Sequence, residues 1–209
     1  MTAAVTEEAR LIALSEIDRL YWTQRDCVLA GMDEVGRGPL AGPVWVACAV
    51  MPPEPLIRYV NDSKKLTERR REALYPVLTE TARAYSTARV SPEVIDEINI
   101  LEATRRAFAE AFAGIRVPVT DVLIDALEGL DIRARQHPLV HGDALSYSIA
   151  CASIIAKVER DRYMIEQDAL YPQYGFARNK GYGTAEHIQA IRAYGPCPIH
   201  RRSFIWRFL

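Results

Sequence analysis

Four acidic side chains stand where apolar segments of the sequence end or where a helical segment begins. Asp33 and Glu34 close one apolar run, and Asp125 closes another. Asp143 precedes a long helical pattern. Side chains at the ends of separate elements can converge, and buried carboxylates that converge repel one another unless cations bind them. Hard oxygen ligands suit Mg²⁺ or Mn²⁺, and two such ions about 4 Å apart can activate a water beside a phosphodiester.

Each of these acids also has a purely structural interpretation. Asp143 can cap the helix that follows it, and Asp125 can be a turn residue. Asp33 and Glu34 are consecutive in a strand, so their side chains should point to opposite faces. A twist or bulge at residues 36–38, where two glycines flank an arginine, would turn Glu34 toward the same cluster and let backbone N–H groups approach a ligand. Alone, Gly-Arg-Gly-Pro is an ordinary tight turn.

The charge of the chain is unevenly distributed. The 209 residues carry a net charge of −1, but residues 171–209 contain six Lys or Arg side chains against one Glu. A basic C-terminal segment joined to an acidic body suits a polyanion whose phosphate is brought to a carboxylate site. A solvated basic tail explains the same pattern.

The sequence also bears on the compartment. Its apolar stretches are too short to cross a bilayer, and residues 1–10 lack the order of a signal peptide. We therefore expect a soluble, cytoplasmic protein without a membrane partner. Four scattered cysteines lack a Cys-x-x-Cys pair and indicate small core residues rather than bridges or zinc ligands.

Hydrophobic periodicity predicts an α/β protein with a mixed sheet. An amphipathic helix over residues 7–21 packs onto the main body, and its spacing indicates no chemistry. The predicted strands cover residues 27–35, 44–51, 84–90, 121–125 and 139–141. The other predicted helices cover residues 67–82, 100–113, 145–168 and 184–193.

Seven motifs follow one another along the chain and together carry a resemblance to a known family. They are Asp33-Glu-Val-Gly-Arg-Gly-Pro-Leu-Ala-Gly-Pro43, Asn61-Asp-Ser-Lys-Lys-Leu66, Leu123-Ile-Asp125, Gly142-Asp143, Ser148-Ile-Ala-Cys-Ala-Ser-Ile-Ile-Ala-Lys-Val-Glu-Arg-Asp161, Lys180-Gly-Tyr-Gly-Thr184, and His200-Arg201 through Ser203-Phe204. In this order they closely resemble ribonuclease HII. The resemblance extends over residues 27–204, and the first motif is highly specific.

The resemblance implies an RNase H-like fold, in which helices flank a mixed central β-sheet and the C-terminal part is helical. It implies an endonuclease that hydrolyses the RNA strand of RNA/DNA hybrids and nicks duplex DNA on the 5′ side of an embedded ribonucleotide. Two-metal catalysis would leave a 3′-hydroxyl and a 5′-phosphate. On this basis we expect an N-terminal helical extension over residues 1–24, a catalytic domain over residues 25–209, and a monomer that acts in ribonucleotide excision, repair and replication.

The resemblance also assigns roles to individual residues. It makes Asp33, Glu34, Asp125 and Asp143 the metal-binding carboxylates, and it makes the backbone of Gly36, Arg37 and Gly38 the part that senses the 2′-hydroxyl of the ribonucleotide. Tyr182 would pack against the neighbouring sugar, and Ser63, Lys64 and Lys180 would touch phosphates. Arg201 and Arg202 lie in the basic C-terminal segment, so we expect them to hold the nucleic-acid backbone. As structural alternatives, Tyr182 is a core aromatic and Lys64 a solvated charge.

Three positions depart from the usual pattern of the family, and none of them is a carboxylate. Ala126 stands where glycine is common, Cys151 where alanine is usual, and Asn179 where histidine is frequent. Ala126 follows Asp125 directly and makes the placement of that acid the least secure of the four.

Other functions are less consistent with the motifs. A type HIII nuclease usually has a lysine in its glycine motif and an extra N-terminal domain, whereas this chain has Arg37 and a short N-terminus. A non-catalytic hybrid-binding module would explain the basic tail but not the four acids, and an NTPase lacks its Gly-Lys-Ser/Thr motif here. Residues 203–209 resemble a replication-clamp peptide only weakly, and docking into the protein's own core is the alternative.

Overall fold

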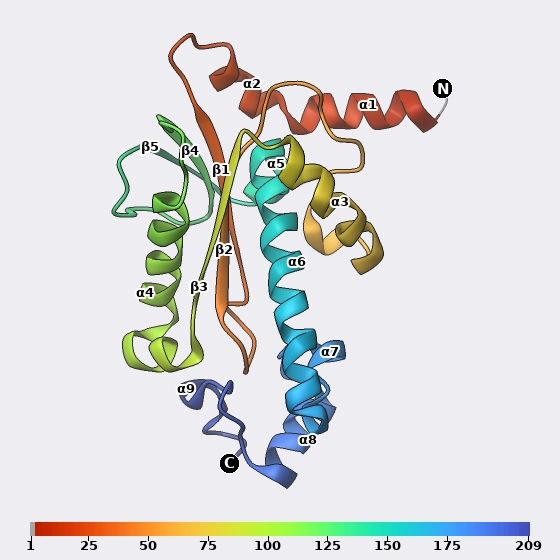
Figure 1. Ribbon diagram of the computed structural model, residues 1–209, viewed down its shortest axis with the longest axis vertical. Coiled ribbons are helices and arrows are strands. Elements are labelled where there is room, and N and C mark those ends of the chain that lie inside the picture. The colour runs from red at the N-terminus through yellow and green to blue at the C-terminus, as the bar shows by residue number, and fades with distance from the viewer. Residues whose placement is uncertain (1–2) are drawn as a thin grey trace.

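A mixed five-stranded sheet forms the centre of the part of the chain that the structure describes. The computed structural model describes the backbone of residues 3–209 and the side chains from residue 6. The strand order is β3-β2-β1-β4-β5 (Figure 1). β1 pairs antiparallel with β2 and parallel with β4, so the sheet is mixed, as predicted. The strands are β1 (Leu29–Val35), β2 (Val44–Val50), β3 (Ala84–Val90), β4 (Asp121–Asp125) and β5 (Arg135–Leu139).

Helices cover both faces of the sheet. α6 packs on β1 and β2, and α4 packs on β2 and β3 from the opposite side (Figure 1). The sheet is thus enclosed between two apolar layers, which explains why all seven residues of β2 are buried and why its sequence is an unbroken apolar run. The helices are α1 (Ala3–Leu14), α2 (Glu16–Trp22), α3 (Glu68–Thr81), α4 (Pro92–Ala113), α5 (Gly142–Leu145), α6 (Tyr147–Leu170), α7 (Phe176–Asn179), α8 (Ala185–Tyr194) and α9 (Arg202–Ile205), with 3₁₀ turns at Ser63–Lys65 and Pro172–Tyr174.

Several elements differ from the sequence prediction. The single helix predicted over residues 7–21 is two helices, α1 and α2, which meet at Ser15. The last strand covers Arg135–Leu139 instead of residues 139–141, because a polar edge strand that contains Pro138 has no apolar run to mark it. The helix predicted from residue 100 begins at Pro92 and bends at Asn99, where φ is +69°. The Asn99 side chain accepts hydrogen bonds from the N–H groups of Leu101 and Glu102, so it caps the second half of α4.

The C-terminal segment is helical and folds back against the end of α6 that is remote from the N-terminal helices (Figure 1). Met164 on α6 packs there with a small apolar cluster that includes Phe176, Ile191 and Ile205. Ile205 is fully buried and Phe208 packs against the same cluster, whereas Trp206 is 64% exposed, so residues 203–209 dock into the core through some of their side chains only. Among the described residues, no helix is both long enough and apolar enough to cross a membrane.

Cysteine usage agrees with the sequence prediction. Cys48, Cys151 and Cys197 are buried free thiols, and Cys27 is half-buried. Burial raises the pKa of the Cys48 and Cys151 thiols well above the ordinary value, so these side chains remain protonated and behave as small apolar residues.

Close contact between β1 and α6 depends on one glycine. A Cβ atom at Gly31 would overlap the backbone of Ser148 and Ile149, whereas a Cβ at Gly38 would meet nothing within 4 Å. We expect Gly31→Ala to lower the free energy of unfolding by roughly 3 kcal/mol, because the strand and the helix must separate. Urea unfolding of this variant beside Gly38→Ala tests the contact, and equal midpoints would contradict it.

Candidate functional site

Three of the predicted acids meet at one place in the fold. Carboxylate oxygens of Asp33, Asp125 and Asp143 all lie within 4.8 Å of one another. Met32 of β1 pairs with Ile124 of β4 in a parallel ladder, so the residues that follow them, Asp33 and Asp125, stand side by side. Asp143 reaches the same point from α5, whose first N–H, from Gly142, donates to Asp125 Oδ1 at 2.8 Å.

Glu34 lies next to this cluster but outside the group of three. Its side chain is 19% exposed, and Oε1 is 3.7 Å from an Nη atom of Arg37. Burial raises the pKa of the Glu34 carboxyl, while the Arg37 charge opposes the shift. Glu34 therefore borders the cluster without belonging to the three residues whose oxygens lie within 4.8 Å of one another.

The electrostatics of the cluster favour a bound cation. Burial, together with the charge of Glu34, raises the pKa of the Asp33 carboxyl well above the usual 3.8. Burial also raises the pKa of Asp143, and Lys64 Nζ, 3.5 Å away, opposes the shift from a side chain that is 78% exposed. A divalent cation would relieve this repulsion, and three converging carboxylate oxygens fit Mg²⁺ or Mn²⁺ well.

The residues predicted to touch phosphates have different exposures. Ser63 is buried, and its Oγ lies 2.8 Å from Ser153 Oγ, so Ser63 faces the protein interior. Lys64 is exposed beside Asp143. Lys180 is largely covered, because its Nζ donates to the Ala177 carbonyl at 2.6 Å and lies 3.5 Å from Glu68.

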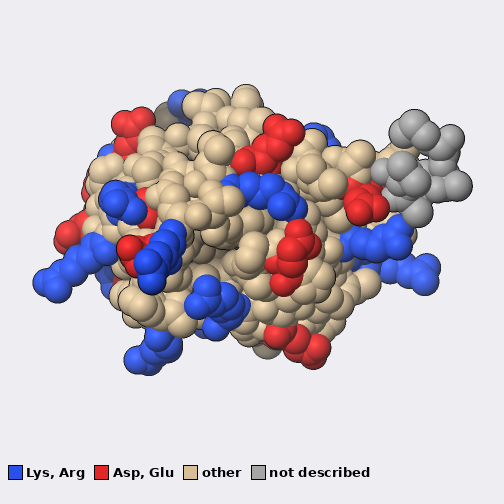
Figure 2. All heavy atoms as spheres, turned by 90° about the horizontal axis from the view of Figure 1, so that it is seen from above, with Lys and Arg blue, Asp and Glu red and all other residues tan. Residues whose placement is uncertain are grey.

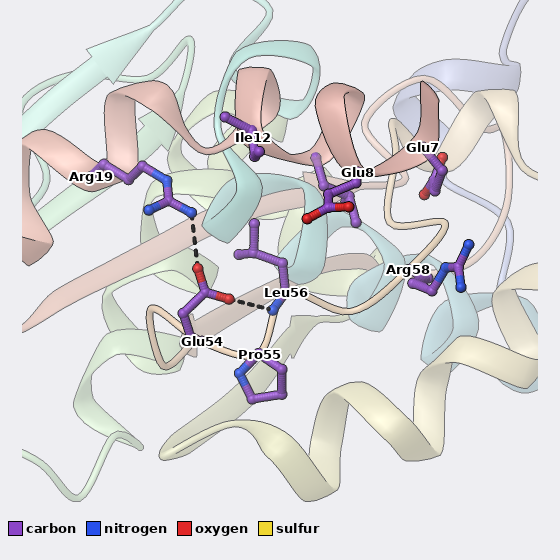
Figure 3. Close-up of a pocket in the computed structure, with 9 residues that line it drawn as sticks. Glu7, Glu8, Ile12, Arg19, Glu54, Pro55, Leu56 and Arg58 are labelled. Atoms are coloured by element: carbon purple, nitrogen blue, oxygen red, sulfur yellow. Dashed lines mark hydrogen bonds and ion pairs between the residues drawn. The ribbon is translucent and has the colours of Figure 1, made fainter. Parts of the chain in front are cut away.

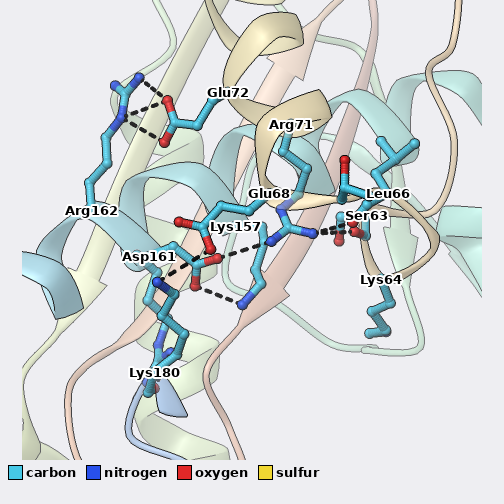
Figure 4. Close-up of polar contacts among 12 residues, drawn as sticks. Ser63, Lys64, Leu66, Glu68, Arg71, Glu72, Lys157, Asp161, Arg162 and Lys180 are labelled. Carbon is cyan, nitrogen blue, oxygen red and sulfur yellow. Dashed lines mark hydrogen bonds and ion pairs between the residues drawn. The ribbon is translucent and has the colours of Figure 1, made fainter. Parts of the chain in front are cut away.

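A buried ion pair fixes the segment that carries Ser63 and Lys64 (Figure 4). Arg71 donates to the carbonyls of Ser63 and Leu66 and to Asp161, which also accepts from Lys157 at 2.7 Å. Because Arg71 is held by Asp161 on α6, the 3₁₀ turn at Ser63–Lys65 is tied to the same helix that packs on β1.

The glycine loop at residues 36–43 is held by two fully buried arginines. Arg201 donates to the carbonyls of Gly36, Arg37 and Gly42. Arg160 on α6 donates to the carbonyls of Ala41, Pro43 and Lys180. In a trans peptide the N–H points away from the C=O, so carbonyls drawn inward at Gly36 and Arg37 turn the following N–H groups outward.

Arg201 therefore has a different place from the one that the sequence suggested. Its side chain is fully buried, so the expected direct contact with a nucleic-acid backbone is not available to it in this structure. Arg160 was missed altogether. The sequence did contain a sign of its burial. Arg160 lies four residues after Ala156 and four before Met164, which places it on the buried face of the helix.

Tyr182 is 43% exposed, so it is not a core aromatic. Its carbonyl accepts from Nδ1 of His187, whose Nε2 is 3.0 Å from Nε2 of His200. The N–H of Cys197 donates to Nδ1 of His200. These contacts assign one tautomer to each ring, with both histidines neutral, because each must accept one hydrogen bond and donate one. The buried pair thus links Tyr182 to the residue that precedes Arg201.

The histidine pair predicts a pH dependence of stability. Burial, and then the charge of His187, lowers the pKa of His200 from 6.5 to about 4. The unfolded chain takes up the proton first as the pH falls, so stability present above pH 6.5 is lost progressively toward pH 4, by on the order of 3 kcal/mol. In His200→Asn this loss should be smaller. Urea unfolding at a series of pH values checks it, and parallel curves for the two proteins would contradict it.

The mixed sheet and the acidic cluster at the ends of β1 and β4 define a hydrolase of the RNase H-like class. The family model described as ribonuclease HII matches residues 30–207. The ribonuclease HII of Caldanaerobacter subterraneus subsp. tengcongensis is 52% identical over 181 residues, which are 87% of this chain and 75% of the relative. That of Acetivibrio thermocellus is 54% identical over 183 residues, 87% of this chain and 71% of the relative.

Solved structures agree. The ribonuclease H2 of Pyrococcus horikoshii OT3 superposes with a TM-score of 0.71 at 29% identity, covering 86% of this chain and 98% of that one. The RNase HII in a PCNA complex from Archaeoglobus fulgidus superposes with a TM-score of 0.71 at 27% identity, and the match covers 87% of this chain and 94% of that one. The chain belongs to the ribonuclease HII family. It is an RNase H endonuclease, and the HIII and non-catalytic alternatives are not favoured.

Proposed function

We propose that Asp33, Glu34, Asp125 and Asp143 hold two divalent cations, Mg²⁺ or Mn²⁺, where the enzyme cleaves the phosphodiester bond on the 5′ side of a ribonucleotide. The observation that carries the proposal is the convergence of three carboxylates within 4.8 Å from β1, β4 and α5. Glu34 borders the cluster and is 19% exposed, so it can complete a second cation site from the open side.

Bound cations would supply the charge that activates water and stabilises the leaving oxygen. The part of the chain is to position them. Asp125 is oriented by the N–H of Gly142, and Asp33 accepts a hydrogen bond from its neighbour's N–H, that of Glu34, at 2.8 Å. Reaction by direct attack of water needs no covalent intermediate and leaves a 3′-hydroxyl and a 5′-phosphate.

The backbone of Gly36, Arg37 and Gly38 would recognise the ribonucleotide. Only the 2′-hydroxyl distinguishes this nucleotide from its deoxy neighbours, and outward N–H groups of a loop without bulky side chains can approach it closely. The exposed ring of Tyr182 would pack on the next sugar. Arg201 would act from beneath the loop, by holding its carbonyls.

Phosphate contacts are assigned to the exposed Lys64 and, once Glu68 is displaced, to Lys180. Seen from the end opposite the C-terminal helices, the surface mixes Lys and Arg with Asp and Glu (Figure 2). Binding would rely on individual lysines beside the site, such as Lys64, with salt-sensitive and sequence-independent contacts to the backbone.

The proposal includes a division of the chain into an N-terminal extension, residues 1–24, and a catalytic domain, residues 25–209. It also includes a cytoplasmic, monomeric enzyme that acts in ribonucleotide excision, DNA repair and DNA replication. A replication clamp is a further candidate partner. The A. fulgidus relative was solved with PCNA, and the exposed Trp206 and Leu209 offer apolar side chains for a contact of that kind.

A duplex with a single ribonucleotide tests the proposal. With Mg²⁺ or Mn²⁺ we expect one nick 5′ to the ribonucleotide and, with chelator, none. Asp33→Asn should lower the cleavage rate by about 10²–10³-fold or more, because a group that stabilises the reacting charge is lost. Binding of the duplex should remain.

Asp131→Asn is the matched control for this experiment, since Asp131 lies at the surface beside α4. Gel analysis of the products and a binding isotherm give the two readouts. Unchanged turnover in Asp33→Asn, or cleavage that persists in chelator, would contradict the proposal.

A further inference from the structure

The helical extension makes one fully buried polar contact with the body of the protein. Asp18 on α2 has no exposed surface. Its carboxylate accepts hydrogen bonds from the N–H of Ser148 at 2.8 Å, the N–H of Tyr147 at 2.9 Å and the hydroxyl of Ser146 at 3.2 Å. These donors lie about 130 residues further along the chain, at the beginning of α6.

Asp18 thereby provides hydrogen-bond acceptors for the first N–H groups of α6, the longest described helix. The first N–H groups of a helix have no partners within it, and a negative charge there is favourable. Asp18 takes the N–H groups of Tyr147 and Ser148, and Ser146 Oγ accepts the next one, from Ile149, at 3.2 Å. The beginning of α6 is therefore fixed by a carboxylate from another helix and by its own N-cap serine.

The other polar contacts between these two helices and the body of the protein are exposed or only partly buried. Arg19 pairs with Glu54 at 2.9 Å, across a pocket of about 360 Å³ between these helices and residues 54–58 (Figure 3). Glu7 accepts from the N–H of Tyr59 at 2.6 Å. These charged groups are solvated at least in part, so such pairs contribute little to the free energy of folding.

The beginning of α6 touches two segments that carry acids of the cluster. The N–H of Ser146 donates to the carbonyl of Gly142 at 2.8 Å, which closes the single turn of α5 around Asp143. Gly31, two residues before Asp33, packs its backbone directly on Ser148. A shift of the helix terminus would thus move Asp143 relative to Asp33.

We propose that Asp18 is a positioning residue of the metal centre: by fixing the N-terminus of α6, it sets the spacing between Asp143 and Asp33. The inference rests on the proposed function, because it takes this cluster as the cation site. Asp18 precedes residues 30–207, the part that the family model matches. The N-terminal extension therefore contributes to the site from outside the matched segment.

The test compares Asp18→Asn with Leu11→Ala. Asparagine keeps one carbonyl oxygen but aims an amide at donors of α6, whereas Leu11→Ala removes apolar packing from α1 and leaves the helix terminus untouched. Titration with Mn²⁺ in a calorimeter gives cation affinity directly, and cleavage of the ribonucleotide duplex at increasing Mn²⁺ gives the half-saturating concentration and the limiting rate.

For Asp18→Asn we expect Mn²⁺ affinity to fall about tenfold, as when a partner that orients a metal ligand is lost. The limiting rate at saturating Mn²⁺ should change little, since the carboxylates themselves remain. Leu11→Ala should lower the unfolding temperature and keep the Mn²⁺ affinity of the unaltered protein. If Asp18→Asn does not fold, Ser146→Ala, which removes one of its partners, should shift the affinity in the same direction.

The outcomes separate the two proposals. If the unaltered protein binds no Mn²⁺, the proposed metal centre fails. If it binds Mn²⁺ and Asp18→Asn, or Ser146→Ala in its place, binds equally well, the role of Asp18 is overturned. An equal loss of affinity in Leu11→Ala would also overturn it, because general destabilisation would then account for the effect.

Discussion

Repulsion among buried carboxylates is the constraint on which the architecture around the site depends. Asp33, Asp125 and Asp143 come from three different elements, and folding brings their oxygens within 4.8 Å. Burial raises the pKa of Asp33 and Asp143, so the cluster opposes its own formation until a cation joins it. Three features hold these carboxylates together although they repel one another. They are the register of β1 with β4, the short helix α5, and the close backbone contact of Gly31 with α6.

A second electrostatic arrangement lies beneath the glycine loop. Arg160 and Arg201 are fully buried, and each donates to three main-chain carbonyls. The planar guanidinium suits this task because its donors spread in a fixed fork, whereas a lysine would offer a single flexible point charge. Burial lowers the pKa of Arg201 to about 9, which leaves it charged at neutral pH. Two positive charges thus lie inside the protein, directly beneath the main chain of the glycine loop.

The sequence predicted the layers of the fold and the convergence of three acids, because strand ends and apolar runs follow local rules. It misplaced the edge strand β5, because the polar sequence of that strand has no regular alternation of apolar residues. The count of basic residues in the C-terminal segment led us to expect Arg201 at the surface. Such a count carries no information about which of these side chains are buried. Asp18 was overlooked although it lies four residues after Leu14 and seven after Leu11, on the apolar face of the predicted helix, because its partners lie about 130 residues away. Contacts between side chains so far apart in the sequence can be recognised only in the folded structure.

The link between Arg201 and Gly36 joins residues 165 positions apart and has a consequence for biosynthesis. Contacts between such distant residues form late, because a long loop must close before they contribute. Until residue 201 has been synthesised, the chain lacks the guanidinium that draws the carbonyls of Gly36 and Arg37 inward. The glycine loop therefore reaches its final conformation only after residue 201 has been synthesised, when all four acidic residues are already part of the chain.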